Sequence, residues 1–231
     1  MIALARFQVA GYLRSLRVLQ PLMVVLLIVA LVLLQRPNHP DEQELLKLAT
    51  GTLGDVAAFM FPIWAWAARA LLDTQPDGQR DLSATAVRHR GAPIAAGLLA
   101  AYAVNLALGA LALAVPLVYG ALAGVETPAL MAGVGLTLLV AASATALGAW
   151  TSRQVIPSPG TGLLVLLSAL LAVLLLGLGP LSPLTVPMLD WIRAAHEGPV
   201  AFTDAYGGIV LRLALWTALV GAGYVLVGRR R

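Results

Sequence analysis

Six apolar runs, each close to the length of a membrane-spanning helix, dominate this chain. They cover residues 18–35, 53–72, 93–119, 128–150, 162–179 and 209–228. A helix needs about 20 apolar residues to cross the ~30 Å of hydrocarbon in a bilayer. The runs are too long for strands and show no alternation of apolar and polar residues. The sequence therefore predicts an all-α polytopic membrane protein with six transmembrane helices.

The composition agrees with this fold class. Hydrophobic residues make up 60% of the chain and charged residues 11%, and the mean hydropathy is +0.88. A soluble domain is nearer half apolar and a quarter charged. The composition of this chain therefore excludes a soluble globular domain. The chain contains no cysteine, which excludes disulfides, thiolate metal ligands and cysteine catalysis.

The basic residues predict the orientation. With both termini in the cytoplasm, one side receives Arg6, Arg14, Arg17, Arg69, Arg80, Arg88, Arg90, Arg153, Arg229, Arg230 and Arg231. The other side receives Arg36, Lys47, Arg193 and Arg212. Basic residues concentrate in cytoplasmic loops, so we expect both termini inside. Arginine-rich usage with a single lysine is typical of a high-GC bacterium, which indicates the bacterial inner (plasma) membrane. The net charge of +4 is explained by these cytoplasmic arginines. We therefore expect no nucleic-acid partner.

The first cytoplasmic loop, residues 73–92, has the pattern of a short capped helix. A turn at 75–78 (QPDG) precedes Asp81, which can cap a helix that starts at Leu82. Gly91 can end this helix, and basic residues in its last turn complement the helix dipole. The residues expected to dock a partner are Asp81, Leu82, Val87, Arg88, His89 and Arg90. The alternative is a capped loop that rests on its own membrane domain.

Residues 1–17 predict an amphipathic helix that lies in the inner membrane interface and contacts lipid. Its expected apolar face is formed by Ile2, Ala5, Val9, Tyr12, Leu13 and Leu16. The flanking basic residues are Arg6, Arg14 and Arg17. The alternative is a basic start that only sets the topology.

The predicted outer connection, residues 180–208, is long and contains four prolines. Within it, residues 186–195 could form a short amphipathic helix. This helix is either a surface element or a re-entrant one, which is tolerated only where protein or water satisfies its backbone.

Polar residues inside the predicted spans are few. Asn105, Ser143 and Thr145 are candidates for a translocation path, and interhelical packing is the favoured alternative for all three. Asp55 is expected to mark the outer end of the second span. No ionisable residue is expected at mid-membrane, which argues against a proton-coupled or ion-coupled carrier.

The sequence also argues against catalysis in this chain. The histidines His39, His89 and His196 are far apart and lack metal-ligand spacing, so no metal site is expected. A phosphate-binding loop needs a lysine in a GxxxxGK[ST] motif, but Lys47 is the only lysine and is predicted to lie outside. No GxSxG nucleophile motif occurs. We expect neither an enzyme nor a cofactor.

The chain resembles the permease subunits of type-2 (type V) ABC exporters. The resemblance is carried by Asp73, Gly78, Arg80, Leu82, Arg88, Arg90 and Pro93. Two departures are Asp where the family usually has Glu, at position 73, and the lack of a mid-helix proline.

The resemblance implies a single permease domain over residues 1–231, with an interfacial helix and short helices between the fifth and sixth spans. It would make residues 81–90 a coupling helix seated on a cytoplasmic ABC ATPase subunit, which would hold ATP and Mg. A second permease copy or a paralogue would complete a dimer that exports a hydrophobic or amphipathic substrate. Open alternatives are a secondary carrier, a membrane anchor or sensor that recruits a cytoplasmic protein, and a haem-exporter permease of cytochrome c maturation.

Overall fold

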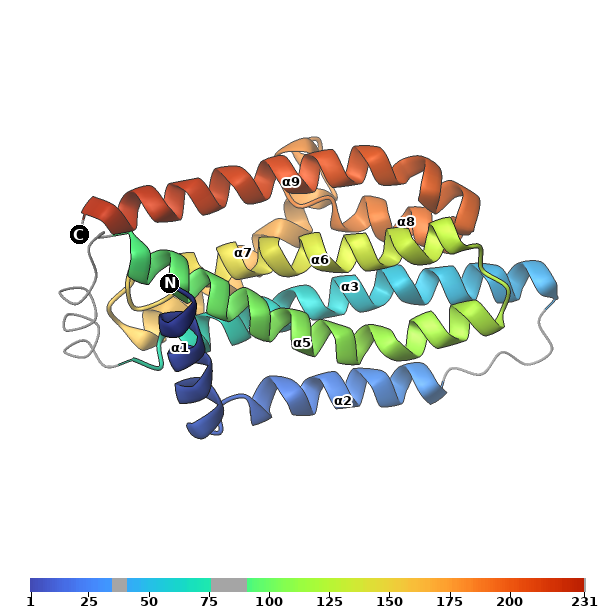
Figure 1. Ribbon diagram of the computed structural model, residues 1–231. Helices are drawn as coiled ribbons and strands as arrows, with labels where there is room; N and C mark the ends of the chain where they lie inside the picture. Colours follow the sequence, from blue (N-terminus) through green and yellow to red (C-terminus); the bar gives the residue numbers. More distant parts are fainter. Residues whose placement is uncertain (35–40, 76–90, 231) are drawn as a thin grey trace.

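The computed structural model describes residues 1–34, 41–75 and 91–230 (Figure 1). Every regular element among them is helical, which confirms the all-α prediction. The elements are α1 (Ile2–Arg14), α2 (Leu19–Leu34), α3 (Glu42–Leu72), α5 (Ala92–Leu122), α6 (Thr127–Trp150), α7 (Pro159–Gly177), the 3-10 helix η1 (Ser182–Leu184), α8 (Met188–Glu197) and α9 (Pro199–Arg230).

Five of these helices are long and apolar enough to cross a membrane, namely α3, α5, α6, α7 and α9. Helix α2 has 16 residues and passes the same test only together with α1, from which it is bent by 77°. The described residues therefore hold five candidate spans, or six if this bent pair counts as one. The prediction of a multi-pass helical protein is confirmed at this level.

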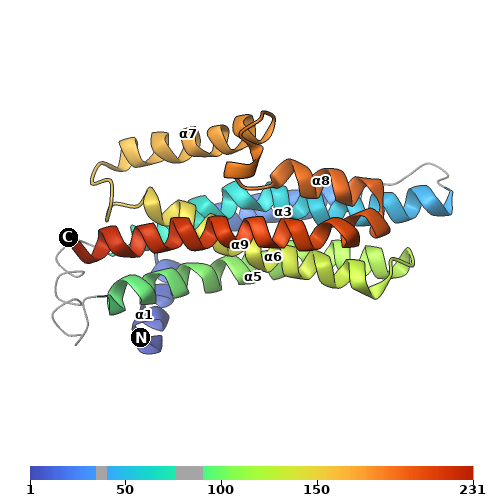
Figure 2. The ribbon, with the colours of Figure 1, turned by 90° about the horizontal axis from the view of Figure 1, so that it is seen from above.

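The long helices lie roughly parallel, and both termini lie at one end of the bundle (Figure 1). We call this end the terminal end and the opposite end the distal end. Helix α3 is central and packs on α5, α6 and α8, while α9 packs on α6. Helix α7 stands apart from the other long helices (Figure 2).

Small residues allow the central helices to approach closely. A Cβ atom on Gly148 of α6 would overlap the carbonyl oxygen of Ala65 in α3. A Cβ atom on Gly109 of α5 would lie 2.8 Å from the ring of Trp64, which is fully buried. Between apolar helices in lipid, association depends on this kind of close packing, because burial of apolar surface adds little there.

Helix α3 begins at Glu42, well before the apolar run predicted from residue 53, and this corrects the prediction. Asp41 caps the helix, because its Oδ1 accepts the N–H of Glu44 at 2.7 Å. Acidic side chains at Glu42 and Glu44 complement the helix dipole. Asp55 consequently lies inside the helix and does not mark its end.

Helix α9 also begins earlier than predicted, at Pro199 instead of residue 209. Gly198, at φ +118°, makes the tight turn between α8 and α9. Residues 199–208 of the predicted connection are therefore helical. Arg212 belongs to α9, where it forms an ion pair with Asp190 of α8 and donates to the Ser182 carbonyl oxygen at 2.5 Å.

The short helix predicted over residues 186–195 is present as α8, shifted by two residues at each end. Trp191 and Ala195 are fully buried, and α8 packs on both α3 and α9. The two alternatives for this helix, a surface element and a re-entrant one, both stay open predictions.

The N-terminal helix differs from its predicted amphipathic face. Ala5 and Tyr12 are buried, but Ile2, Leu13 and Leu16 are exposed. The helix packs its Ala5–Tyr12 side on α5 and ends at Arg14, before a left-handed turn at Leu16 with φ 58°. Burial raises the pKa of Tyr12 to about 12, although the neighbouring Arg17 acts to lower it.

Candidate functional site

A buried pair of opposite charges closes α3 at the terminal end of the bundle. Arg69 lies in the last helical turn and Asp73 is the C-cap residue. Their i,i+4 spacing places both side chains on one face, with Nε of Arg69 3.7 Å from Oδ2 of Asp73. The side chains are 9% and 11% exposed, so each charge needs partners that replace water.

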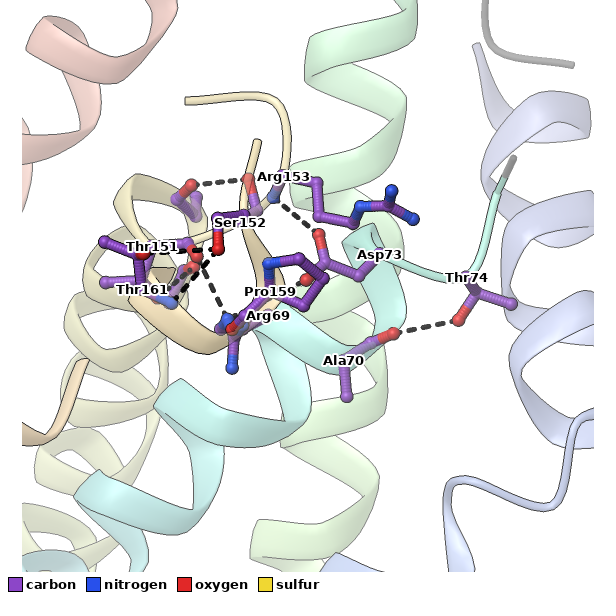
Figure 3. Close-up of polar contacts among 12 residues, drawn as sticks. Arg69, Ala70, Asp73, Thr74, Thr151, Ser152, Arg153, Pro159 and Thr161 are labelled. Atoms are coloured by element: carbon purple, nitrogen blue, oxygen red, sulfur yellow. Dashed lines mark hydrogen bonds and ion pairs between the residues drawn. The ribbon is translucent and has the colours of Figure 1, made fainter. Parts of the chain in front are cut away.

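Arg69 joins α3 to both ends of the α6–α7 connection (Figure 3). Its Nε donates to the carbonyl oxygen of Thr151 at 3.0 Å, and its Nη2 donates to that of Pro159 at 2.5 Å. Thr151 is the C-cap of α6 and Pro159 is the first residue of α7. A guanidinium can make these contacts at once because its donors are fixed in one plane.

Asp73 makes the complementary contact to the same connection. Its Oδ1 accepts the backbone N–H of Arg153 at 2.7 Å (Figure 3). Its backbone carbonyl oxygen accepts a hydrogen bond from Nη1 of Arg17 at 3.5 Å. We refer to Arg69, Asp73, Thr151, Arg153 and Pro159 as the Arg69–Asp73 cluster.

The cluster requires a glycine in the first turns of α7. A Cβ atom on Gly162 would lie 2.7 Å from the Thr151 carbonyl oxygen and 3.1 Å from Nη2 of Arg69. The start of α7 is fixed separately by Ser158, whose Oγ accepts the N–H of Thr161 at 3.5 Å. The first turn of α7 is therefore held at a set distance from the end of α3.

The cluster lies where the predicted coupling loop, residues 73–92, leaves α3. The six predicted docking residues, from Asp81 to Arg90, lie outside the described residues. At the far end of this loop, Ile94 of α5 packs with Ala149 and Tyr224. Tyr224 in turn donates to Oε1 of Gln154 at 2.5 Å. Both ends of the loop thus contact the region around the α6–α7 connection.

The three basic residues predicted for the N-terminal helix are exposed. Among them, Arg17 reaches the end of α3 through Asp73, as described above. Arg6 and Arg14 lie on α1 at the terminal end (Figure 1). The segment predicted to lie at the interface therefore contacts the base of the predicted coupling loop.

The candidates inside the spans lie in helix contacts. Asn105 is fully buried, and its Nδ2 donates to the carbonyl oxygen of Trp64 at 3.1 Å and to Oγ1 of Thr145 at 2.9 Å. Ser143 lies apart from them and shares a hydrogen bond of 2.5 Å with Thr217 of α9. Both sets of contacts join different helices, α3, α5 and α6 in the first case and α6 and α9 in the second.

Sequence reasoning missed the Arg69–Asp73 cluster as a site. Arg69 was used only as one of the basic residues that predict the orientation. Asp73 was used only as one of the residues that carry the family resemblance. A signal was present, because an arginine lies in the last turn of a long apolar run and an acid follows four positions later. Among the described residues, no group of three His, Asp or Glu side chains could hold a metal ion.

The fold and these contacts define a class, that of multi-pass α-helical membrane proteins with a buried polar cluster at one end of the bundle. Comparison of the chain with models of protein families, with curated proteins and with solved structures finds no match.

Proposed function

We propose that this chain is the membrane-spanning permease subunit of an ATP-driven ABC exporter. It moves a hydrophobic or amphipathic substrate by alternating access, powered by a separate ATPase subunit that holds ATP and Mg. It works with a second permease copy or a paralogue, in a bacterial inner membrane with both termini in the cytoplasm. The chain itself carries no catalytic site.

The observation that supports this proposal most is the Arg69–Asp73 cluster at the base of the 73–92 loop. A solvated connecting loop does not need a buried ion pair at its root, and burying charges costs free energy. Here the pair ties the loop to α6 and α7 through Thr151, Arg153 and Pro159. A displacement of the loop would therefore move these helices with α3.

In the proposed cycle, ATP binding closes two partner ATPase domains against each other. The coupling helix at residues 81–90 follows the ATPase, and the cluster passes this movement to the ends of α3, α6 and α7. Rigid-body shifts of packed helices of this kind are a common form of conformational switching. The spans then open a path between the two permease chains.

Charge reversal in the coupling helix tests the proposal. We expect Arg88→Glu combined with Arg90→Glu to abolish copurification of the ATPase and its stimulation by the permease, because the docking surface changes sign. The matched control reverses two other basic residues, Arg230→Glu and Arg231→Glu, and keeps the ATPase bound. Unchanged ATPase binding and stimulation in the Arg88/Arg90 variant would contradict the docking role.

A further inference from the structure

A groove of about 840 Å³ lies between α2, α3 and α5, toward the distal end of the bundle. Its wall is mostly apolar and includes Val32 of α2, Leu48 of α3, and Val115 and Val118 of α5. Binding sites for small molecules commonly have volumes of about 300–1,000 Å³ and a few placed polar groups among apolar ones. The groove is therefore large enough for one compact organic ligand.

One carboxylate lines this apolar wall. Asp55 of α3 is 28% exposed at its side chain, and its Oδ1 lies 2.9 Å from Nε2 of His196. Its Oδ2 has no hydrogen-bond partner among the described residues. His196 is the only basic side chain in the described lining, and it contacts Oδ1 and not Oδ2. A carboxylate beside apolar groups is costly unless a cation or several donors satisfy it.

The helix that carries His196 is held close to α3 by two glycines. A Cβ atom on Gly54 would lie 2.7 Å from Cβ of Ala195, and one on Gly51 would lie 3.0 Å from the His196 ring. Helix α8 is also joined to α9 by the ion pair between Asp190 and Arg212. The Asp55–His196 pair is therefore part of a packed assembly, and Asp55 keeps a fixed place in the groove wall.

We propose that this groove binds a compact amphipathic amine. The ammonium group donates to Oδ2 of Asp55, and the apolar body lies against Val115 and Val118. An ammonium supplies three donors and a positive charge, whereas an anionic head group would be repelled by the carboxylate. A ligand without a hydrogen-bond donor would shield Asp55 from water without replacing its hydrogen bonds, and a neutral donor would leave its charge unbalanced. That this amine is also the exported cargo rests on the proposed function.

Photolabelling of the purified full chain in lipid nanodiscs, without any ATPase, tests the site. The probe is a decyl chain that carries a diazirine and a primary amine, compared with the same chain ending in a carboxylate. We expect the amine probe to label the α5 segment that contains Val115 and Val118, and unlabelled decylamine to compete. Equal labelling by the carboxylate probe, or the absence of competed labelling by the amine probe, would overturn the proposal.

Variants separate a specific site from general attraction to an acidic surface. Asp55→Asn is expected to lower labelling about tenfold, because a charge-assisted hydrogen bond is lost, and Asp55→Glu is expected to recover most of it. Glu197→Gln removes an exposed acid next to His196 and is expected to change nothing. Val115→Phe keeps the charge and fills the groove, so it should also reduce labelling. Labelling of Asp55→Asn at the level of the unmodified chain would show that the groove takes only a lipid tail.

This binding assay contains no ATPase, so its result is independent of coupling-helix docking. Loss of amine binding with intact ATPase docking would remove the cargo assignment and leave the permease proposal. Amine binding without any ATPase partner would leave a ligand-binding membrane protein of another kind.

Discussion

The side-chain carboxylate of Asp73 accepts the backbone N–H of Arg153 at 2.7 Å, across 80 positions of the sequence. This bond joins the end of α3 to the connection between α6 and α7. Arg69 repeats the link through the carbonyl oxygens of Thr151 and Pro159. Three helices of the bundle are therefore held together at the point where residues 73–92 begin.

Removing the charge of Asp73 should destabilise the terminal end of the bundle. In Asp73→Asn the amide oxygen can still accept from Arg153, but buried Arg69 loses its counter-charge. We expect unfolding to become easier by about 1–3 kcal/mol, seen as a lower Tm in detergent. The control is Asp204→Asn on exposed α9 surface, which should change stability by less than about 0.5 kcal/mol. Equal Tm values for the two variants would contradict a structural role for Asp73.

A methyl group at Gly162 should disturb the same cluster from the side of α7. The Cβ atom of Gly162→Ala would lie too close to the Thr151 carbonyl oxygen and to Arg69. Overpacking of this kind costs about 1–3 kcal/mol, so we expect a lower Tm. Gly160→Ala is the matched control, because a Cβ atom there meets nothing within 4 Å. Equal destabilisation by Gly160→Ala and Gly162→Ala would contradict a steric role for the missing side chain at Gly162.

A double-mutant cycle measures the bond between Asn105 and Thr145, which are 2.9 Å apart at Nδ2 and Oγ1. We expect Asn105→Ala and Thr145→Val to be non-additive, with a coupling of about 0.6 kcal/mol and at most about 1.7 kcal/mol, the average and the maximum found for hydrogen bonds between membrane helices. The measurement is unfolding in detergent of both single variants and the double variant. Strict additivity, together with altered substrate selectivity, would instead place these residues on the translocation path.

The contact of Arg212 with Asp190 and the Ser182 carbonyl oxygen should hold η1 and α8 against α9. We expect Arg212→Gln to speed hydrogen exchange and proteolysis in the segment between α7 and α9. Arg193→Gln, which changes an exposed arginine on α8 itself, serves as the control and should have little effect. If hydrogen exchange and proteolysis of this segment are similar in both variants, the burial of Trp191 and Ala195 is sufficient to hold α8 in place.

The apolar runs predicted the bundle because length and hydropathy are local properties of the sequence. The short helix α8 was predicted for the same reason, from its amphipathic pattern between prolines. The beginnings of α3 and α9 were missed because polar first turns, such as the one capped by Asp41, do not add to an apolar run. The buried side of α1 was predicted only in part. Ala5 and Tyr12 are buried because α1 packs on α5, whereas Leu13 is exposed.

The polar contacts were harder to predict than the helices. Arg69 and Thr151 are 82 positions apart and Asp55 and His196 are 141 positions apart. Neither pair has a spacing signal, because only the packing of the helices brings the members together. Asn105 was singled out from the sequence as the polar residue of its span, but its partners Trp64 and Thr145 depend on the α3–α5–α6 contact.

We propose that this chain works with a separate ATPase, and one measurement tests this directly. The most direct measurement is a mild-detergent pull-down of the tagged chain from its native membranes, with mass spectrometry of the copurified proteins. We expect a phosphate-loop ATPase at about equal stoichiometry, and a second, similar membrane protein if the dimer is heteromeric. Failure to recover any ATPase, even after crosslinking, would contradict the proposed permease function and favour an anchor or a secondary carrier.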